Sequence, residues 1–215
     1  MVEKLPTYKT PFAIFIIWLF HLSALIGIHL GHQDWFVSKT PINLMIVLIL
    51  FLWVYPINSL RKYIAFGFFF TVGMFAEWLG VNYGILFGDY AYGANFGPKL
   101  DGVPYLIGVN WAVLTFITAI IASKFAKSPL VKITAASLLM LFLDYLMEHT
   151  APVFDFWTFS GGLAGWMNYV CWFALALLFQ TVLHFTGIKG NYRFSLHLYL
   201  AQLVFFGYLF FYLKP

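Results

Sequence analysis

Charge is scarce in this sequence. Only 9% of its 215 residues are Asp, Glu, Lys or Arg, whereas about 25% is usual in soluble domains. The single cysteine, Cys171, excludes an intramolecular disulfide framework and a metal cage made of thiolates. The chain also has no glycine-rich phosphate cradle after a strand, no Ser-His-Asp order and no basic-aromatic stripe. These absences argue against a nucleotide-binding enzyme and a triad hydrolase, and we expect no nucleic-acid partner.

Histidines are present, but they do not cluster. His29 and His32 have a spacing that suits a metal site, and the others are scattered: His21, His149, His184 and His197. Membrane di-iron enzymes need several groups of histidine ligands. We therefore expect neither a metal nor another cofactor.

Apolar residues dominate what is there. They make up 62% of the chain, and the mean hydropathy is +0.86. A helix needs about 17–25 apolar residues to cross the hydrocarbon core of a membrane. Seven segments qualify: 12–30, 41–57, 63–80, 105–123, 130–148, 164–185 and 195–213. The sequence therefore predicts an all-α integral membrane protein, a single polytopic domain over residues 1–215 with a bundle of about seven transmembrane helices.

Two stretches between the predicted spans are not helical. Residues 81–104 and 149–163 are both rich in glycine, proline and aromatic residues. Irregular backbone at membrane depth is tolerated only where it is buried in protein or lines a cavity. We expect the first stretch, between the third and fourth spans, to be an outer loop or a re-entrant one.

Basic residues predict the orientation in the membrane. With seven spans, nine Lys and Arg residues fall on the side of the N-terminus, and three fall on the opposite side. The nine are Lys4, Lys9, Arg61, Lys62, Lys124, Lys127, Lys132, Lys189 and Arg193, and the three are Lys39, Lys99 and Lys214. Cytoplasmic loops carry the excess of basic residues. We therefore expect a multi-pass protein of the inner (cytoplasmic) membrane with its N-terminus in the cytoplasm.

The acids are distributed in the opposite way. Of the eight, Glu3 lies on the cytoplasmic side and Asp34 in the first outer loop. The other six fall at the outer ends of spans three and five or in the loops that follow: Glu77, Asp89, Asp101, Asp144, Glu148 and Asp155. Two distant parts of the chain should thus bring carboxyl groups together on the non-cytoplasmic side.

Three of these acids lie within predicted spans. A carboxylate at the centre of a membrane costs about 2.5–3.5 kcal/mol on insertion scales, so Glu77 either faces a cavity or reaches the interface. Asp144 and Glu148 are four residues apart and share one helix face. Their mutual repulsion in a low-dielectric site favours protonation of one of them, which would make an acid able to donate a proton at neutral pH. The alternative is a polar contact between helices.

The remaining acids and the aromatic residues allow two interpretations. Asp89 and Asp101 either order a lid-like loop or make ordinary turns. The aromatic residues near the acids either form the interfacial belt or stabilise a cation through their ring faces. Asn110-Trp111 and Asn168-Tyr169 each open a span after an acidic, glycine-bearing loop, as a parallel internal repeat would.

The chain resembles a known family over about residues 70–175. "EWLGVNYGILFGDYAYG", then "GPKLDGVPYLIGVNW" and "DYLMEHTAPVFDFW", are similar to the CruF-type carotenoid 1,2-hydratases, which are related to the bisanhydrobacterioruberin hydratases. The resemblance implies that water adds to the terminal 1,2 double bond of an acyclic carotenoid ψ-end, such as that of lycopene, γ-carotene or a bacterioruberin precursor. A carboxylic acid would protonate the alkene, a tertiary carbocation would form, and water would attack it without a redox cofactor.

This chemistry suggests a set of candidate residues. We expect Glu77 or Asp144 to donate the proton, and Glu148 or Asp155 to position water. The candidate catalytic residues are Glu77, Asp144, Glu148, Asp89 and Asp155, and the candidate substrate-binding residues are Trp78, Tyr83, Tyr90, Trp111, Trp157, Asn110, Asn168 and Asp101. The expected partners are a carotenoid drawn from the bilayer, lipid, and other enzymes of carotenoid biosynthesis.

Three other functions fit parts of the pattern. A carotenoid cyclase or another prenyl-chain enzyme also begins with protonation of an alkene, but it adds no oxygen. A proton-coupled transporter also uses acids within the membrane, yet it would distribute them along a path through the bilayer. A pigment-binding scaffold would keep its pigment chemistry unchanged when the acids are replaced.

Overall fold

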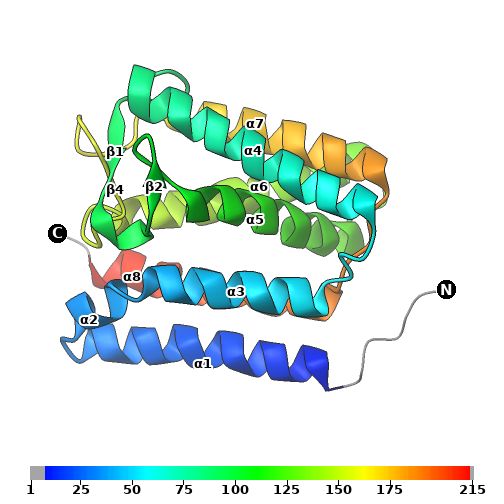
Figure 1. Ribbon diagram of the computed structural model, residues 1–215, viewed down its shortest axis with the longest axis horizontal. Coiled ribbons are helices and arrows are strands. Elements are labelled where there is room, and N and C mark those ends of the chain that lie inside the picture. Colours follow the sequence, from blue (N-terminus) through cyan, green and yellow to red (C-terminus); the bar gives the residue numbers. More distant parts are fainter. Residues whose placement is uncertain (1–7, 214–215) are drawn as a thin grey trace.

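Helix α5 (Tyr105–Phe125) is the central element of the computed structural model, which describes residues 8–213 (Figure 1). In its most apolar 18-residue window, 78% of the residues are buried, against 28–39% in the other long helices. It packs against α3, α4, α6, α7 and α8. Of the charged residues used to predict the orientation, Glu3, Lys4 and Lys214 lie outside the described residues.

All seven predicted spans coincide with helices. They are α1 (Lys9–His29), α3 (Thr40–Val54), α4 (Leu60–Tyr83), α5, α6 (Pro129–Thr150), α7 (Trp166–Thr186) and α8 (Tyr192–Tyr212), and a short α2 (Gln33–Val37) joins α1 to α3. Six of these helices are long and apolar enough to cross a membrane, and α3 is a shorter apolar helix of 15 residues. The prediction of an all-α, multi-pass membrane protein is confirmed.

The end of α3 has a local cause. The prediction extended this span to residue 57, but the helix ends at Val54. Tyr55 has extended backbone angles (φ −86°, ψ 131°) and precedes Pro56. The proline ring disfavours the helical conformation in the residue before it. Proline therefore ends α3 three residues earlier than hydropathy alone indicates.

The two irregular stretches form one folded layer, which we call the cap and define as residues 84–104 and 151–165. Strand β1 (Tyr90–Tyr92) pairs antiparallel with β4 (Trp157–Phe159), with Tyr90 opposite Phe159 and Tyr92 opposite Trp157. Strands β2 (Lys99–Leu100) and β3 (Val103–Pro104) form a second pair beside the 3₁₀ helix η1 (Ala94–Phe96). Figure 1 shows β1, β2 and β4 together at one end of the helices. The cap therefore joins the loop after α4 to the loop after α6.

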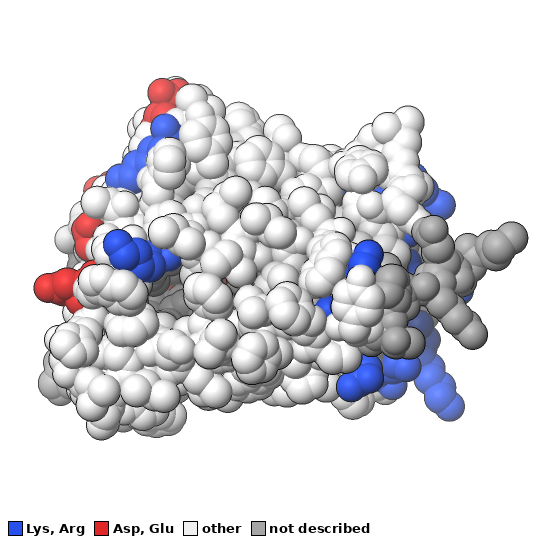
Figure 2. Space-filling model, turned by 60° about the horizontal axis from the view of Figure 1, so that its bottom comes forward, with Lys and Arg blue, Asp and Glu red and all other residues white. Residues whose placement is uncertain are grey.

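Charge is divided between the two ends of the bundle. Among the described residues, the end opposite the cap carries basic residues at α1, α4, α5, α6 and α8: Lys9, Arg61, Lys62, Lys124, Lys127, Lys132, Lys189 and Arg193. Figure 2 shows acidic residues at the other end of the visible face, together with a few basic ones. The middle of that face is mostly uncharged (Figure 2), as expected for a surface in contact with lipid tails.

Two parts of the fold follow the same order. The first is α4, β1 and α5, and the second is α6, β4 and α7. Helices α4 and α6 both run toward the cap, and α5 and α7 both run away from it (Figure 1). The pairing of β1 with β4 joins the two parts at their equivalent strands. Each part carries a buried glutamate near the end of its first helix, Glu77 in α4 and Glu148 in α6.

Candidate active site

Glu77 lies about two turns before the end of α4, and its side chain is 3% exposed. Its Oε1 accepts a hydrogen bond from Trp111 Nε1 in α5 at 2.8 Å. Its Oε2 accepts from the hydroxyl of Tyr92 at 2.8 Å and from the hydroxyl of Tyr90. Three donors from one helix and one strand therefore surround a carboxyl group that is out of contact with water.

Two glycines of α4 make room for these donors. A Cβ at Gly80 would lie 2.7 Å from a ring carbon of Tyr90, and a Cβ at Gly73 would lie 2.9 Å from the ring of Trp111. Contacts this short are repulsive. The glycines stand seven residues apart, about two turns, on the helix face that carries Glu77. The sequence of α4 thus lets two aromatic side chains approach closely enough to bond its glutamate.

Glu148 is the buried glutamate of the second part. Its Oε2 accepts from Trp157 Nε1 of β4 at 3.0 Å, and its Oε1 accepts from Asn168 Nδ2 of α7 at 3.1 Å. It is 5% exposed. Since an indole N–H can donate but not accept, this carboxyl is also held as an acceptor.

Asp144 differs from both glutamates. It is 2% exposed, and its Oδ2 has no hydrogen-bond partner among the described residues. It precedes Glu148 by one helical turn, so both side chains lie on the same face of α6. An unpaired buried oxygen costs about 1–3 kcal/mol, and such atoms in native structures call for a functional or solvent partner.

The three carboxyl groups share one small void at the cap end of the helices. Its volume is about 20 Å³, which is enough for one water molecule. Trp172, whose ring stacks on that of Trp111 at 3.7 Å, forms part of its wall. The lining residues are Glu77, Phe87, Tyr90, Tyr92, Ile107, Asp144, Met147, Glu148, Trp157, Asn168 and Trp172.

The tyrosines of β1 are fixed as neutral donors. Burial first, and then the negative charge of Glu77, raise the pKa of both Tyr90 and Tyr92 well above its ordinary value. Deprotonation would place a second negative charge beside Glu77 away from water. Both hydroxyls therefore remain donors to this carboxyl group at any physiological pH.

The three remaining predicted acids lie on the surface of the cap. Asp89, Asp101 and Asp155 are exposed and do not line the void. Asp101 and Asp155 have positive φ angles of 45° and 52°, and Asp155 accepts from the backbone N–H of Ala94 at 2.7 Å. The carbonyl of Asp101 accepts from the side chain of Asn82. The structure therefore places these residues where they shape turns.

The predicted substrate-binding residues divide in the same way. Tyr90, Trp111, Trp157 and Asn168 all donate to a buried carboxyl group. Trp78 and Tyr83 pack against each other with ring centroids 5.1 Å apart. Tyr83 is 61% exposed, and neither it nor Trp78 lines a described cavity.

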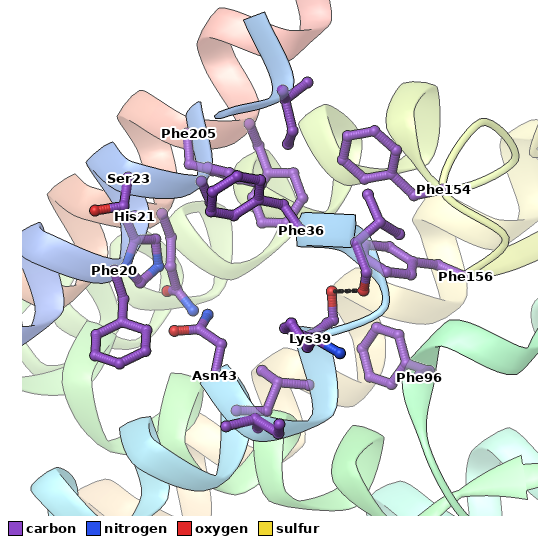
Figure 3. Close-up of a pocket in the computed structure, with 18 of the residues that line it drawn as sticks. Phe20, His21, Ser23, Phe36, Lys39, Asn43, Phe96, Phe154, Phe156 and Phe205 are labelled. Atoms are coloured by element: carbon purple, nitrogen blue, oxygen red, sulfur yellow. Dashed lines mark hydrogen bonds between the residues drawn. The ribbon is translucent and has the colours of Figure 1, made fainter. Parts of the chain in front are cut away.

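Asn110 lines a second, larger cavity of about 580 Å³, which we call the chamber. Its walls come from α1, α2, α3, α5, α6, α8 and the cap. Figure 3 shows the rings of Phe36, Phe96, Phe154 and Phe156 gathered around one part of it. Phe20, His21, Ser23 and Asn43 surround another part. The chamber is therefore mostly apolar, with a few polar side chains.

The chain matches the family described as carotenoid biosynthesis protein over residues 39–214. It belongs to this family. No curated protein and no solved structure matches the chain. The family match gives the protein a role in carotenoid biosynthesis and agrees with the resemblance seen in the sequence. The matched residues include all three buried carboxyl groups, and α1 and α2 lie before the first matched residue.

Several residues of this carotenoid-biosynthesis protein were not among the predicted site residues. Tyr92 and Trp172 stand among many aromatic residues, and nothing in their spacing separates them from an interfacial belt. Met147 and Ile107 are ordinary apolar residues of a membrane helix, although Met147 falls between Asp144 and Glu148. Among the described residues, no group of three His, Cys, Asp or Glu side chains is arranged to hold a metal ion.

Proposed function

We propose that this protein adds water to the terminal 1,2 double bond of an acyclic carotenoid ψ-end. The observation that carries the proposal is the void shared by Glu77, Asp144 and Glu148, which has room for one water molecule. Membership of a carotenoid biosynthesis family supports a polyene as the substrate. Lycopene, γ-carotene and bacterioruberin precursors all carry this end group.

In the proposed mechanism Asp144 holds the proton. Glu77 and Glu148 accept hydrogen bonds from indole N–H groups, which cannot act as acceptors. These donors favour the ionised form of both glutamates over that of Asp144, and a third negative charge beside them in a low-dielectric site would be strongly disfavoured. Asp144 lacks donors on Oδ2 and is the carboxyl group that takes the neutral form. A neutral carboxylic acid is what protonation of an unactivated alkene requires.

The reaction then proceeds in two steps that balance. The Asp144 hydroxyl transfers its proton to carbon 2 of the end group, and the π electrons of the double bond form the new C–H bond. This step leaves a tertiary carbocation at carbon 1 and a carboxylate at Asp144. The water in the void attacks carbon 1 and returns one proton to Asp144, directly or through Glu148. The net change is addition of one water, and no redox cofactor takes part.

The walls of the void suit a carbocation. The carboxylates of Glu77 and Glu148 offset its positive charge, and fixed charges in a site without bulk water stabilise a transition state more than they would in solution. The ring of Trp172, which stacks on Trp111, adds a negative π face. Its position is fixed before the reaction because Trp111 is also bonded to Glu77.

The room for water favours hydration over cyclisation. A cyclase would protonate the same alkene but must exclude water from the cation. The void here is small, is lined by three carboxyl groups and is sized for one water molecule. A hydratase needs such a place for its second substrate.

The charge distribution supports an orientation. The basic end would lie in the cytoplasm, and the cap with its acids would lie on the non-cytoplasmic side of the inner membrane. The polyene would enter from the bilayer, and the other enzymes of carotenoid biosynthesis would be the partners that deliver and remove it.

Expression in a bacterium that accumulates lycopene tests the proposal. The native chain should yield hydroxylated carotenoid with the mass gain of one water per reacted end. Asp144→Asn should lower its formation by about 10²–10⁴-fold, the usual contribution of a general acid. Asp89→Asn, a change at an exposed acid of the cap, is the matched control and should leave it unchanged. Undiminished product from Asp144→Asn would remove Asp144 as the proton donor, whereas a ring product without added oxygen, or no hydroxylated product from the native chain, would contradict the proposed function.

A further inference from the structure

The void and the chamber are separated by a single side chain. Met147 lines both cavities, and it alone does so among the described residues. It lies on α6 between Asp144 and Glu148. On α5, Ile107 borders the void and Asn110 borders the chamber, one turn apart. The two cavities are therefore neighbours across a wall that is one residue thick at Met147.

The void by itself cannot admit the end of a carotenoid. Its volume of about 20 Å³ suits one water, whereas the end group of a polyene carries several carbon atoms. The chamber has the capacity that the void lacks: its 580 Å³ falls within the range of about 300–1,000 Å³ that is usual for sites of organic ligands. In the conformation that the structure describes, the carboxyl groups are thus closed off from a carotenoid held in the chamber.

The chamber suits a long apolar ligand. Phenyl rings from α2, η1, the cap and α8 form much of its wall, and none of the described lining residues is acidic. Leu19 of α1 and Ile42 of α3 line it and are 45% and 56% exposed. The mouth of the chamber therefore lies between α1 and α3, on helices whose outer surfaces face lipid. A ligand dissolved in the bilayer can reach it without crossing water.

Met147 can change its conformation more readily than the aromatic side chains that line the void. Tyr92 and Trp157 are held by hydrogen bonds to Glu77 and Glu148, and Trp172 is stacked on Trp111. Methionine is unbranched, has three rotatable bonds and adapts to irregular space. A change of its rotamers would join the two cavities and leave the hydrogen bonds of both glutamates intact.

We infer that the chamber between α1, α3 and α8 binds the chain of a linear isoprenoid, and that Met147 is the gate through which its reacting end reaches the carboxyl groups. The inference rests on the proposed function for the chemistry at the gate. The family match covers the parts of the chamber wall that come from α3, α5, α6 and α8, and α1 and α2 lie before it.

Binding to the chamber is measured without turnover in the Asp144→Asn background. The purified variant in detergent should retain lycopene, read from pigment absorbance per protein. Ala24→Trp, which places an indole in the chamber, should lower the retained pigment by at least about tenfold, equivalent to about 1.4 kcal/mol. Leu22→Trp is the matched control, because Leu22 lies on the same helix, is 42% exposed and does not line the chamber. Equal retention by both Trp variants would overturn the chamber as the binding site.

The gate is tested by the size of residue 147. In the chain that keeps Asp144, Met147→Phe should lower hydration of lycopene by at least about tenfold. In the Asp144→Asn background, the same substitution should leave pigment retention unchanged. Met147→Leu conserves volume and is the control, with hydration close to that of the native chain. Met147→Ala should hydrate at least as fast as the native chain, and thermal unfolding of each variant shows whether it is folded.

The outcomes separate this inference from the proposed function. If Met147→Phe is folded and hydrates as fast as Met147→Leu while Asp144→Asn is inactive, the gate is wrong and the proposed function stands. If Asp144→Asn is fully active, Asp144 is not the proton donor, and if the native chain adds no water to lycopene, the proposed function is wrong, whatever the pigment retention shows about the chamber. Loss of both pigment retention and hydration in Met147→Phe would also contradict a gate, since a gate leaves the chamber intact.

Discussion

The two helix–strand–helix parts hold their glutamates in the same way, but they differ in the residue that stands one helical turn before each glutamate. Glu77 and Glu148 each accept from an aromatic side chain of the following strand and from a side chain of the next helix. Four residues before Glu148 stands Asp144, whereas four residues before Glu77 stands Gly73. Gly73 makes room for Trp111. In the proposed mechanism, one part therefore fixes an ionised acceptor, and the other adds to its acceptor an acid that carries the proton.

This difference explains how like carboxyl groups take unlike roles. Donors from the cap and from α5 and α7 stabilise charge on both glutamates. Asp144 receives no such help at Oδ2 and is surrounded by their charge. In the proposed mechanism the two similar parts thus supply the charges around the site, and Asp144, which has no counterpart in the first part, supplies the proton.

Removing the charge of each glutamate in turn tests whether the two parts act alike. Glu148→Gln should lower hydration by about 10²–10³-fold, a loss typical for removal of a preorganised group beside a developing charge. Glu77→Gln should have a smaller effect, of about tenfold, because Glu77 lies on another helix from Asp144. Product formation in the lycopene-accumulating host measures both, with exposed Asp155→Asn as the control. Equal activity of Glu148→Gln and the native chain would remove Glu148 from the mechanism.

Replacing the indole donors compares the rigidity of the two parts. Trp111→Phe and Trp157→Phe each remove one N–H donor from a buried carboxylate, which should cost about 1–3 kcal/mol of unfolding free energy. Trp111→Phe also weakens the stack on Trp172, which should add about 0.5–1.5 kcal/mol. Thermal unfolding in detergent should therefore rank Trp111→Phe below Trp157→Phe. The reverse order would show that the second part is the more tightly held.

Glycine substitutions in α4 test the close approach of Tyr90 to Glu77. Gly80→Ala would push Tyr90 away, with an expected loss of about 1–3 kcal/mol of stability together with reduced hydration. Gly67→Ala is the matched control, because no atom lies within 4 Å of a Cβ placed there. It should be neutral or stabilise the helix by about 0.5–1 kcal/mol. Similar unfolding temperatures for the two variants would contradict this account of α4.

The smallest expected effect concerns alkaline pH. The pKa of Tyr92 is raised by burial and by the charge of Glu77, so the folded state keeps its proton after the unfolded chain has lost it. The contribution of this residue to stability is complete below about pH 10, the ordinary tyrosine pKa, and falls as pH rises above it. Tyr92→Phe should therefore make the decrease of unfolding temperature above about pH 10 shallower. An unchanged slope would place Tyr92 in contact with water.

Much of the fold follows from local patterns. The seven spans come from hydropathy, and the shared face of Asp144 and Glu148 follows from their spacing along one helix. The approach of Glu77 to that face follows from the parallel course of α4 and α6. The predicted end of α3 was too late because it was based on hydropathy and did not take Pro56 into account, which ends the helix at Val54.

Other features depend on contacts between distant residues. The pairing of β1 with β4 joins three-residue strands more than 60 residues apart, and strands so short give little signal of their own. Whether an acid of the cap turns inward or outward depends on that pairing, so the sequence did not decide whether Asp89, Asp101 and Asp155 join the site. The chamber and the position of Met147 arise from the packing of α1, α2, α3 and α8, which no spacing in the chain predicts.

Infrared spectroscopy of the protonated carboxyl stretch tests the central claim most directly. The native protein at neutral pH should show the band of a buried neutral carboxylic acid, and the band should vanish in Asp144→Asn. A loss of this band in Glu77→Gln or Glu148→Gln with its persistence in Asp144→Asn would contradict the claim that Asp144 holds the proton between two ionised glutamates.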